Sequence, residues 1–476
     1  MVSDYIGEQN MNMITFSIEV DSNIPIYRQL YNYIKTEIQT GRITFNTKLP
    51  SKRKLSSYLK ISQNTIQIAY DQLIEEGYVA SIERKGFFVC KLDNIIELKV
   101  NKLGDPTDKK SNKSGIKYDF SYNGIDAESF PYSIWRRLTK DVINEYDKEL
   151  FQLGNSQGNI TLRKSIAEYL HQSRGVSCSA NQIVISAGTE FLFQILIQLF
   201  DQNSVYGIEN PGYEKLNLLF RSNRAKYQPI NIDKNGMILD EIIKSNANIL
   251  CITPAHQFPS GGIMPINRRI QLLNWANDAD DRYIIEDDYD SEFKYSGKPI
   301  PALQGVDANG KVIYMGALSK SLSPAIRVSY MVLPDKLLKR YTENLSFLIC
   351  PVPSIEQNVL CKFIQDGYFE RHLNKMRNIY KKKRETLVSE ITKLNCDIEV
   401  IGADAGLHLL LRVNNGMTEK QLINTAFQAG VKVYDLSEYY FEKTSTEETS
   451  TIILGYATMD EEEIKKAVNI LYNAWF

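Results

Sequence analysis

Apolar residues near the start of the chain recur at the three- and four-residue spacing of amphipathic helices. Three such segments follow one another: residues 25–41, a segment that begins after Ser51, and a segment from Ser62 to Gly77. Serine is a favoured N-cap because its hydroxyl accepts a backbone N–H at the open end of a helix. Glycine suits the other end because it adopts the left-handed backbone that closes a helix. We therefore predict three helices.

The pattern then changes to two short β-type runs, residues 78–82 and 87–89, joined by the basic tetrapeptide ERKG. Gly86 permits the tight turn between them. Three helices followed by a hairpin with a basic tip are typical of a winged helix-turn-helix. We assign this domain to residues 14–92.

The next segment, residues 93–116, is rich in Lys, Asn, Asp, Ser and Gly and contains no aromatic residue. This composition predicts a solvated linker. Beyond it, apolar strand-like runs alternate with helical ones, as in α/β proteins. The clearest strand-like runs are residues 182–186, 249–253, 283–286 and 312–315. We therefore predict one large domain over residues 117–476, whose part from about residue 370 forms a smaller α+β lobe.

Charge is divided unevenly along the chain. The whole protein has a formal net charge of -1, whereas residues 24–92 contain eleven Lys or Arg and five Asp or Glu, a net charge of +6. A basic module on an acidic body is typical of a protein that binds nucleic acid. With 43% hydrophobic and 24% charged residues, the composition is that of a globular protein. The strongest apolar run, residues 191–200, is too short to span a membrane.

Cysteine usage and the N-terminal sequence indicate a cytoplasmic protein. No secretory signal precedes the first domain. The six cysteines are scattered without a C-x-x-C pair, which predicts neither a disulfide framework nor a metal site.

The expected DNA-reading residues lie at three places in the N-terminal domain. The start of the third helix enters the major groove in a helix-turn-helix, and short polar side chains there can meet base edges. Basic residues at the start of the second helix and at the hairpin tip are expected to reach phosphates or the minor groove. These candidates are Gln63, Asn64, Thr65, Lys52, Arg53, Arg84 and Lys85.

The segment LPSKRKLSSYLKISQNTIQIAYDQLIEEGYVASIERKGFFV resembles the winged helix of GntR-type regulators throughout its length. The resemblance implies binding to double-stranded DNA. That family often has arginine where this chain has Gln63, so its base preference cannot be transferred.

A second set of candidate residues follows strand-like runs of the large domain. Gly188 and Thr189 open a predicted helix after one run and could hold a phosphate on backbone N–H groups. Another run ends in Glu-Asp-Asp-Tyr, where α/β proteins bind ligands. A third is followed by the pentapeptide GALSK and by Arg327.

Pyridoxal 5'-phosphate (PLP) needs the residue types that this set offers, in the order used by fold-type-I aminotransferases. Lys320 would form the Schiff base, Asp287 would pair with the ring nitrogen, and Tyr289 would contact the ring hydroxyl. Tyr213 would lie over the ring. The phosphate would be held by Gly188, Thr189, Ser319 and Arg327. The predicted fold class is therefore α/β, with a winged helix-turn-helix and a PLP-dependent fold-type-I aminotransferase-like domain.

The segments YIIEDDYDSEF, VIYMGALSKSLSPAIRVSYMVLP, HQFPSGGIMPINRRIQLLNWA and AGLH resemble the MocR subfamily of GntR regulators. The resemblance covers nearly the whole chain from Pro25. It implies a head-to-tail homodimer in which each large domain holds PLP and the paired DNA-binding domains read two half-sites. It also implies a sensor with little turnover, and so no catalytic residues.

The effector is suggested by a missing arginine. Aminotransferases of this fold usually hold the substrate carboxylate with an arginine of the C-terminal lobe, yet none follows Arg412 here. The corresponding position is Thr458 by our alignment. Near Tyr213, where related regulators place a second arginine, the chain has Glu214 and Lys215. We therefore hypothesise that the regulator senses PLP itself and controls vitamin B6 biosynthesis genes.

Three alternatives remain. The effector could be an amine or amino acid, such as a γ-amino acid, captured as an external aldimine. The protein could be an active aminotransferase with a DNA-binding module, although Phe258 replaces the asparagine that many such enzymes have in N-P-x-G. Regulation could also proceed without PLP.

Overall fold

The computed structural model describes residues 14, 16, 18–19, 24–92, 115–145, 148–295, 300–441 and 450–476. The chain divides into two compact units, with the boundary between Asn112 and Lys113. Each unit is described by itself. Of the predicted linker, 93–116, only the last two residues belong to the described part of the chain.

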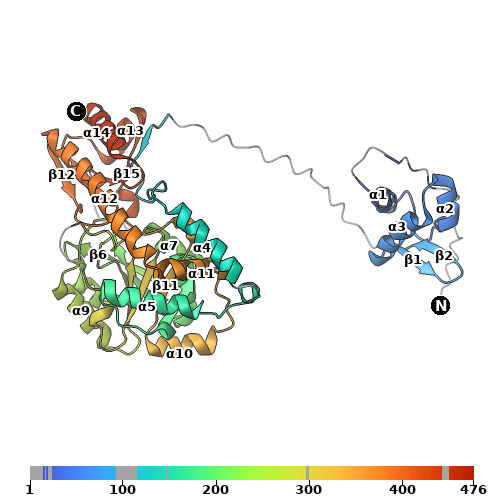
Figure 1. The fold of residues 1–476 in the computed structure, drawn as a ribbon, viewed down its shortest axis with the longest axis horizontal. Coiled ribbons are helices and arrows are strands. Elements are labelled where there is room, and N and C mark those ends of the chain that lie inside the picture. The colour runs from blue at the N-terminus through green and yellow to red at the C-terminus, as the bar shows by residue number, and fades with distance from the viewer. Residues whose placement is uncertain are drawn as a thin grey trace. The chain divides into compact units, whose positions relative to one another are not determined.

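In its described residues the first unit contains three helices and a two-stranded hairpin, as predicted (Figure 1). Ser51 and Ser62 cap the second and third helices by accepting the backbone N–H of Lys54 and Thr65, at 3.3 and 3.0 Å. The apolar residues of the helical pattern form one buried core, which includes Leu30, Leu55, Ile66 and Leu73. The elements are α1 (Ile26–Gln39), α2 (Lys52–Leu59), α3 (Gln63–Glu75), β1 (Val79–Ile82) and β2 (Gly86–Val89).

The second unit is built on a large sheet with the strand order β4-β11-β10-β9-β8-β5-β6-β7. The pairs from β10 to β6 are parallel, whereas β11 runs antiparallel to both β10 and β4. The strands are β4 (Ile183–Ser186), β5 (Val205–Asn210), β6 (Lys226–Asp233), β7 (Gly236–Met237), β8 (Ile249–Ile252), β9 (Tyr283–Asp288), β10 (Val312–Ala317) and β11 (Ser329–Val332).

Helices cover both faces of this sheet, and the strand sequences explain why. Successive residues of β9 point to opposite faces: Ile284 packs into one apolar cluster and Ile285 into another. A strand buried on both faces needs a continuous apolar run rather than an alternating one. The helices are α4 (Tyr132–Glu145), α5 (Ile160–Arg174), α6 (Thr189–Leu199), α7 (Glu214–Ser222), α8 (Leu239–Lys244), α9 (Ile266–Asn277), α10 (Asp335–Asn344) and α11 (Ser354–Gln365).

A smaller lobe follows the large sheet. The long helix α12 connects the two parts: Phe369 and Leu373 pack with the large sheet, whereas Tyr380 and Leu387 lie in the core of the small lobe. The lobe contains a four-stranded sheet of order β12-β13-β16-β15. Its elements are α12 (Tyr368–Lys393), β12 (Ile398–Ile401), β13 (His408–Val413), α13 (Glu419–Gln428), β14 (Val431–Lys432), β15 (Tyr434–Asp435), β16 (Thr451–Gly455) and α14 (Glu461–Trp475).

The start of the second unit belongs to this lobe, which the sequence did not indicate. Strand β3 (Tyr118–Asp119) pairs with β14, and Phe120 is fully buried in the lobe core. Two residues later, Tyr122 packs against Phe258 of the large-sheet part and against Tyr434 of the small lobe. Short 3-10 turns complete the described structure: η1 (Glu149–Phe151), η2 (Ala180–Gln182), η3 (Gln304–Val306), η4 (Pro324–Ile326) and η5 (Ser437–Tyr439).

The sheet topology positions the candidate site. Parallel strands β5, β8, β9 and β10 end at one edge of the sheet, so the loops that follow them meet there. Within the described residues, no helix has the length and apolar character needed to cross a membrane.

Candidate cofactor and DNA-binding sites

A cavity of about 320 Å³ lies at this edge of the sheet, within the size range of small-molecule sites. The structure places all eight of the predicted cofactor-binding residues in its wall: Gly188, Thr189, Tyr213, Asp287, Tyr289, Ser319, Lys320 and Arg327. These residues come from four different strand-to-helix or strand-to-loop connections. Their convergence is therefore a result of the fold.

Lys320 lies just after β10 and is partly buried in the cavity wall. Its ammonium Nζ donates a hydrogen bond to the backbone oxygen of Tyr122 at 2.6 Å. The pKa of Lys320 is lowered to about 8, mainly by burial; the charge of Asp290 opposes this shift and that of Lys215 adds to it. A lysine with a lowered pKa has a larger neutral fraction near pH 7, and the neutral amine is the nucleophile that condenses with a carbonyl.

The acidic residues at the end of β9 have separate partners. Glu286 accepts the backbone N–H groups of Leu303 and Gln304, at 2.8 and 2.9 Å. Asp288 pairs with the buried guanidinium of Arg174 at 2.8 Å. Asp287 lines the cavity instead, and its buried Oδ1 has no hydrogen-bond partner among the described residues.

The environment of Asp287 is strongly unfavourable for an isolated anion. Burial raises its pKa to about 7, and the charges of Asp288 and Glu209 act in the same direction. A buried acceptor without a donor costs free energy, so this site suits a ligand with a cationic N–H. A protonated pyridine nitrogen meets that requirement.

An anion-binding turn lies at the start of α6. Gly188 has a φ of +110°, and a Cβ there would lie 2.2 Å from Nη2 of Arg327. The turn therefore requires glycine to let the guanidinium approach. Arg327 donates to the backbone oxygen of Ala187 at 3.2 Å and to Oε2 of Glu190 at 3.0 Å. The N–H groups at the helix start and this guanidinium together favour an anion.

Aromatic side chains form another wall of the cavity. Tyr213 meets Phe258 edge-on, with 5.9 Å between ring centroids, and Tyr122 packs against Phe258 at 5.7 Å. Phe258, which stands where many aminotransferases have asparagine, supplies packing and no side-chain hydrogen bond. The wall suits a flat ring.

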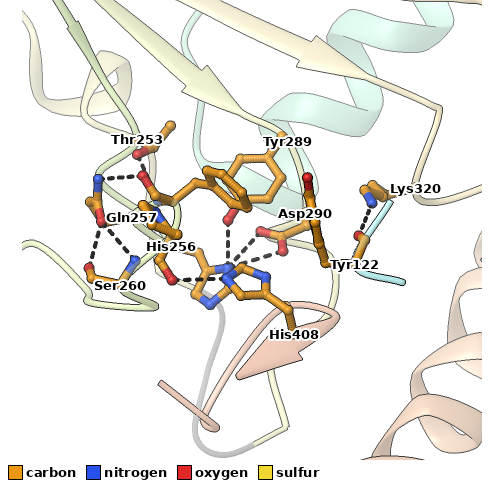
Figure 2. Close-up of polar contacts among 12 residues, drawn as sticks. Tyr122, Thr253, His256, Gln257, Ser260, Tyr289, Asp290, Lys320 and His408 are labelled. Carbon is orange, nitrogen blue, oxygen red and sulfur yellow. Dashed lines mark hydrogen bonds and ion pairs between the residues drawn. The ribbon is translucent and has the colours of Figure 1, made fainter. Parts of the chain in front are cut away.

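A polar cluster beside Tyr289 was not assigned from the sequence. The hydroxyl of Tyr289 lies 3.0 Å from Nδ1 of His256, and that nitrogen also lies 3.0 and 3.1 Å from the two carboxylate oxygens of Asp290 (Figure 2). His408 packs on the ring of His256. The motifs HQF and AGLH contain these histidines, but only the tertiary structure brings them to Tyr289.

The two positions compared with the carboxylate-binding arginines of related proteins differ in their relation to the cavity. Thr458 does not line it; its hydroxyl donates to the backbone oxygen of Asp119 at 3.3 Å. Lys215 does line it. Among the described residues, the cations of the cavity wall are Lys215, Lys320 and Arg327.

The predicted DNA-reading residues lie mostly on the surface of the first unit. Gln63, Asn64, Arg53, Arg84 and Lys85 are exposed. The other two have partners inside the unit. The hydroxyl of Thr65 lies 2.8 Å from that of Ser62 in the helix cap, and Lys52 bonds to the side-chain oxygen of Gln67.

Comparison with known families gives one match to each unit. Residues 26–89 match the family described as bacterial regulatory proteins, gntR family. Residues 121–471 match aminotransferase class I and II. Two named regulators are similar to this chain over nearly its whole length. The uncharacterized HTH-type transcriptional regulator YdeL of Bacillus subtilis is 41% identical over 454 residues, covering 95% of this chain and 97% of that protein.

The probable rhizopine catabolism regulatory protein MocR of Rhizobium meliloti is 31% identical over 477 residues, 96% of this chain and 95% of that protein. This chain belongs to the MocR subfamily of GntR-type regulators. The MocR-type chain is also 27% identical over 440 residues to the pyridoxine biosynthesis regulator PdxR of Corynebacterium glutamicum, covering 92% and 93%.

Solved structures confirm the predicted fold of the second unit of this MocR-type regulator. The multiple substrate aminotransferase of Thermococcus profundus superposes with a TM-score of 0.67 at 22% identity, over 76% of this chain and 92% of that chain. The second unit therefore has the fold-type-I aminotransferase fold, and the first is the GntR-type DNA-binding module.

Proposed function

We propose that this MocR-type regulator binds PLP in the cavity, senses PLP itself and controls genes of vitamin B6 biosynthesis. The observation that carries the proposal is the unpartnered carboxylate of Asp287, which lies in one cavity with Lys320 and the anion-binding turn. When bound, PLP supplies an electrophilic aldehyde and an electron-withdrawing ring.

The residues fit each part of that ligand. Asp287 would hold the protonated ring nitrogen and relieve its own unfavourable burial. The phosphate would be held by Arg327 and the start of α6, together with Ser319 and Thr189. Tyr213 would cover the ring. Lys320 would hold the cofactor covalently, because its lowered pKa favours the neutral amine.

PLP as effector is supported by what surrounds this cofactor site. Thr458 lies outside the cavity wall and cannot replace the carboxylate-binding arginine of aminotransferases. The PdxR relative is named for pyridoxine biosynthesis. A ligand shifts a regulator only by binding one of its states more tightly, so PLP occupancy would have to favour one arrangement of the DNA-binding modules.

An amine or amino acid effector is the second candidate, and Lys215 favours it. This lysine lines the cavity and could attract a carboxylate as a point charge, without the two-pronged contact of arginine. The MocR relative is named for the catabolism of rhizopine. In either case the second unit works as a sensor.

A DNA-binding measurement distinguishes these functions. Affinity for the protein's own promoter DNA is measured with the apoprotein, with PLP, and with PLP plus each candidate amine. The proposal expects PLP alone to change the affinity and K320A to abolish this response. A change that requires an amine supports the second candidate. Multiple turnovers with an amino acid and a keto acid would establish an active aminotransferase, and a normal response of K320A would establish regulation without bound PLP.

A homodimer is part of the proposal and is supported by exposed apolar residues along one sheet edge. Two loops contact the edge strand β4 at Ile185, which bonds to Gln157 of one loop and Cys350 of the other. Large apolar side chains in these loops are 74–80% exposed: Phe151, Leu153 and Phe347. Such a surface is typical of an interface, and a second copy of the chain is the expected partner.

A further inference from the structure

Three residues beside the cofactor cavity form a buried polar chain. His256 and Asp290 are each only 2% exposed. Nδ1 of His256 lies within 3.1 Å of both carboxylate oxygens of Asp290 and 3.0 Å from the hydroxyl oxygen of Tyr289 (Figure 2). Tyr289 and Asp290 both line the cavity, and His256 joins their side chains.

The hydrogen-bonding capacity of these groups determines the direction of the chain. A carboxylate can only accept, so the hydrogen must be on Nδ1 of His256. Nδ1 then donates toward Asp290 and toward the oxygen of Tyr289, and it has no lone pair with which to accept the phenolic proton. Among the described residues, the Tyr289 hydroxyl has His256 as its hydrogen-bond partner. The proton of Tyr289 is therefore free for a group inside the cavity.

The AGLH segment of the small lobe holds this arrangement in place. A Cβ on Gly406 would lie 2.1 Å from Cε1 of His256 and 2.4 Å from Oδ2 of Asp290, so only glycine lets the backbone pack against the pair. His408 packs on His256 with ring centroids 5.1 Å apart, and its Nε2 lies 3.1 Å from the backbone oxygen of Pro259. Burial lowers the pKa of His408 to about 3, so this neighbour is neutral.

We propose that His256 and Asp290 are positioning residues that direct the hydroxyl proton of Tyr289 into the cavity, toward the ring oxygen of the cofactor. The inference rests on the proposed binding of PLP. A phenol that donates to this oxygen stabilises its ionised form. The PLP-loaded protein should then change its visible absorption at a lower pH than it would without this donor.

Other ionisable groups also face this chain and contribute to the observed pH midpoint. They come from four elements around Tyr289 and His256: Asp287 and Asp288 of β9, Glu209 of β5, His408 of β13, and Lys320 after β10. Because all of them, and Asp290 itself, are retained in variants of His256, a comparison between those variants isolates the effect of the positioning pair.

The test is a pH titration of the visible absorption of the PLP-loaded, full-length protein. Y289F removes the donor and should raise the midpoint by about one pH unit, the effect of one hydrogen bond to a charged group. H256F should shift the midpoint in the same direction. The double variant H256F/Y289F should shift it no further than Y289F, because both changes remove the same hydrogen bond. H256N retains an N–H donor and should restore much of the wild-type value.

Y341F is the control. It removes the hydroxyl of a buried tyrosine outside the cavity wall, which donates to the backbone oxygen of Ser156 at 3.2 Å, and it should leave the midpoint unchanged. An H256F variant that binds PLP with the wild-type midpoint overturns the inference. Additive shifts in the double variant also overturn it, and so does loss of PLP binding in H256F and H256N alike. A wild-type protein that does not bind PLP contradicts the proposed function instead.

Discussion

The guanidinium of Arg327 lies 3.0 Å from the carboxylate of Glu190 at the start of α6. Glu190 is on the first turn of the helix, and hydrogen bonds from its own backbone N–H and from Arg327 help to lower its pKa, against the opposing effect of burial. One of the chain's own carboxylates therefore occupies part of the turn that we assign to the phosphate. A phosphate that binds there has to displace it.

We accordingly expect E190Q to bind PLP more tightly. The change removes a competing negative charge and keeps the shape of the side chain. Because partly exposed ion pairs contribute about 1 kcal/mol or less, the expected gain in affinity is up to about fivefold. Titration of the apoprotein with PLP measures it. E214Q is the control, since Glu214 lies outside the cavity wall; an equal gain in E214Q would show a general charge effect.

Asp287 makes a prediction about the pH dependence of apoprotein stability. Its pKa is about 7 in the folded protein, above the value near 4 of an unfolded chain. The folded state therefore binds an extra proton between these values, and the stabilisation that this carboxyl provides is lost as pH rises toward 7. In D287N this loss is absent. Its melting midpoint relative to wild type should be higher at pH 8 than at pH 5, by about 3 °C.

The same variant should respond differently to the cofactor. PLP should raise the melting midpoint of the wild type much more than that of D287N, because the amide cannot hold a protonated ring nitrogen as an ion pair. Thermal unfolding without PLP at pH 5 and pH 8 measures the pH effect, and unfolding with and without PLP at pH 8 measures the response to the cofactor. Equal PLP stabilisation of the two proteins would contradict the assigned role of Asp287.

The hairpin tip of the DNA-binding unit predicts a salt effect. Arg84 and Lys85 are exposed between β1 and β2. If both contact phosphates, R84A/K85A should weaken binding to specific and unrelated DNA alike. The slope of log affinity against log salt should become shallower by about two. R42A is the charge control, because Arg42 pairs with Glu37 at the end of α1. An unchanged slope would exclude the tip from the interface.

Gln63 and Asn64 should behave differently from the hairpin tip. Both are exposed at the start of α3, the helix expected in the major groove. Alanine at either position should reduce discrimination between the operator and mutated operators, with little change in the salt slope. Competition binding with single-base variants of the operator measures this, and a uniform loss across all sequences would contradict base reading.

The exposed apolar edge of the large sheet predicts the assembly state. F347D and L153D place a charge on side chains that are 74% and 80% exposed in the single chain. Either change should convert a dimer to a monomer in sedimentation or gel filtration. I243D is the control, because Ile243 lies on α8 and is also exposed, at 63%. Dimers that survive both edge variants would place the interface elsewhere.

The amino-acid sequence by itself determined the main helices and strands of this protein and identified the candidate cofactor-binding residues. Helical spacing, serine caps and glycine ends specify α1 to α3, because these are local interactions that need no distant partner. Apolar runs that end in polar residues specify β9 and β10 and place Asp287 and Lys320 after them. The order of these motifs was enough to indicate the family.

Only the tertiary structure decided what surrounds those residues. Glu190 meets Arg327, and His256 meets Asp290, across 137 and 34 positions of sequence. Glu286, Asp287 and Asp288 are adjacent acidic residues with different environments. Asp288 is paired with Arg174, Glu286 accepts backbone N–H groups, and Asp287 faces the cavity with no partner for its Oδ1 among the described residues. Burial and hydrogen-bond partners depend on packing between segments that are distant in the sequence. Burial and partners together determine the protonation state and the orientation of each side chain at the site.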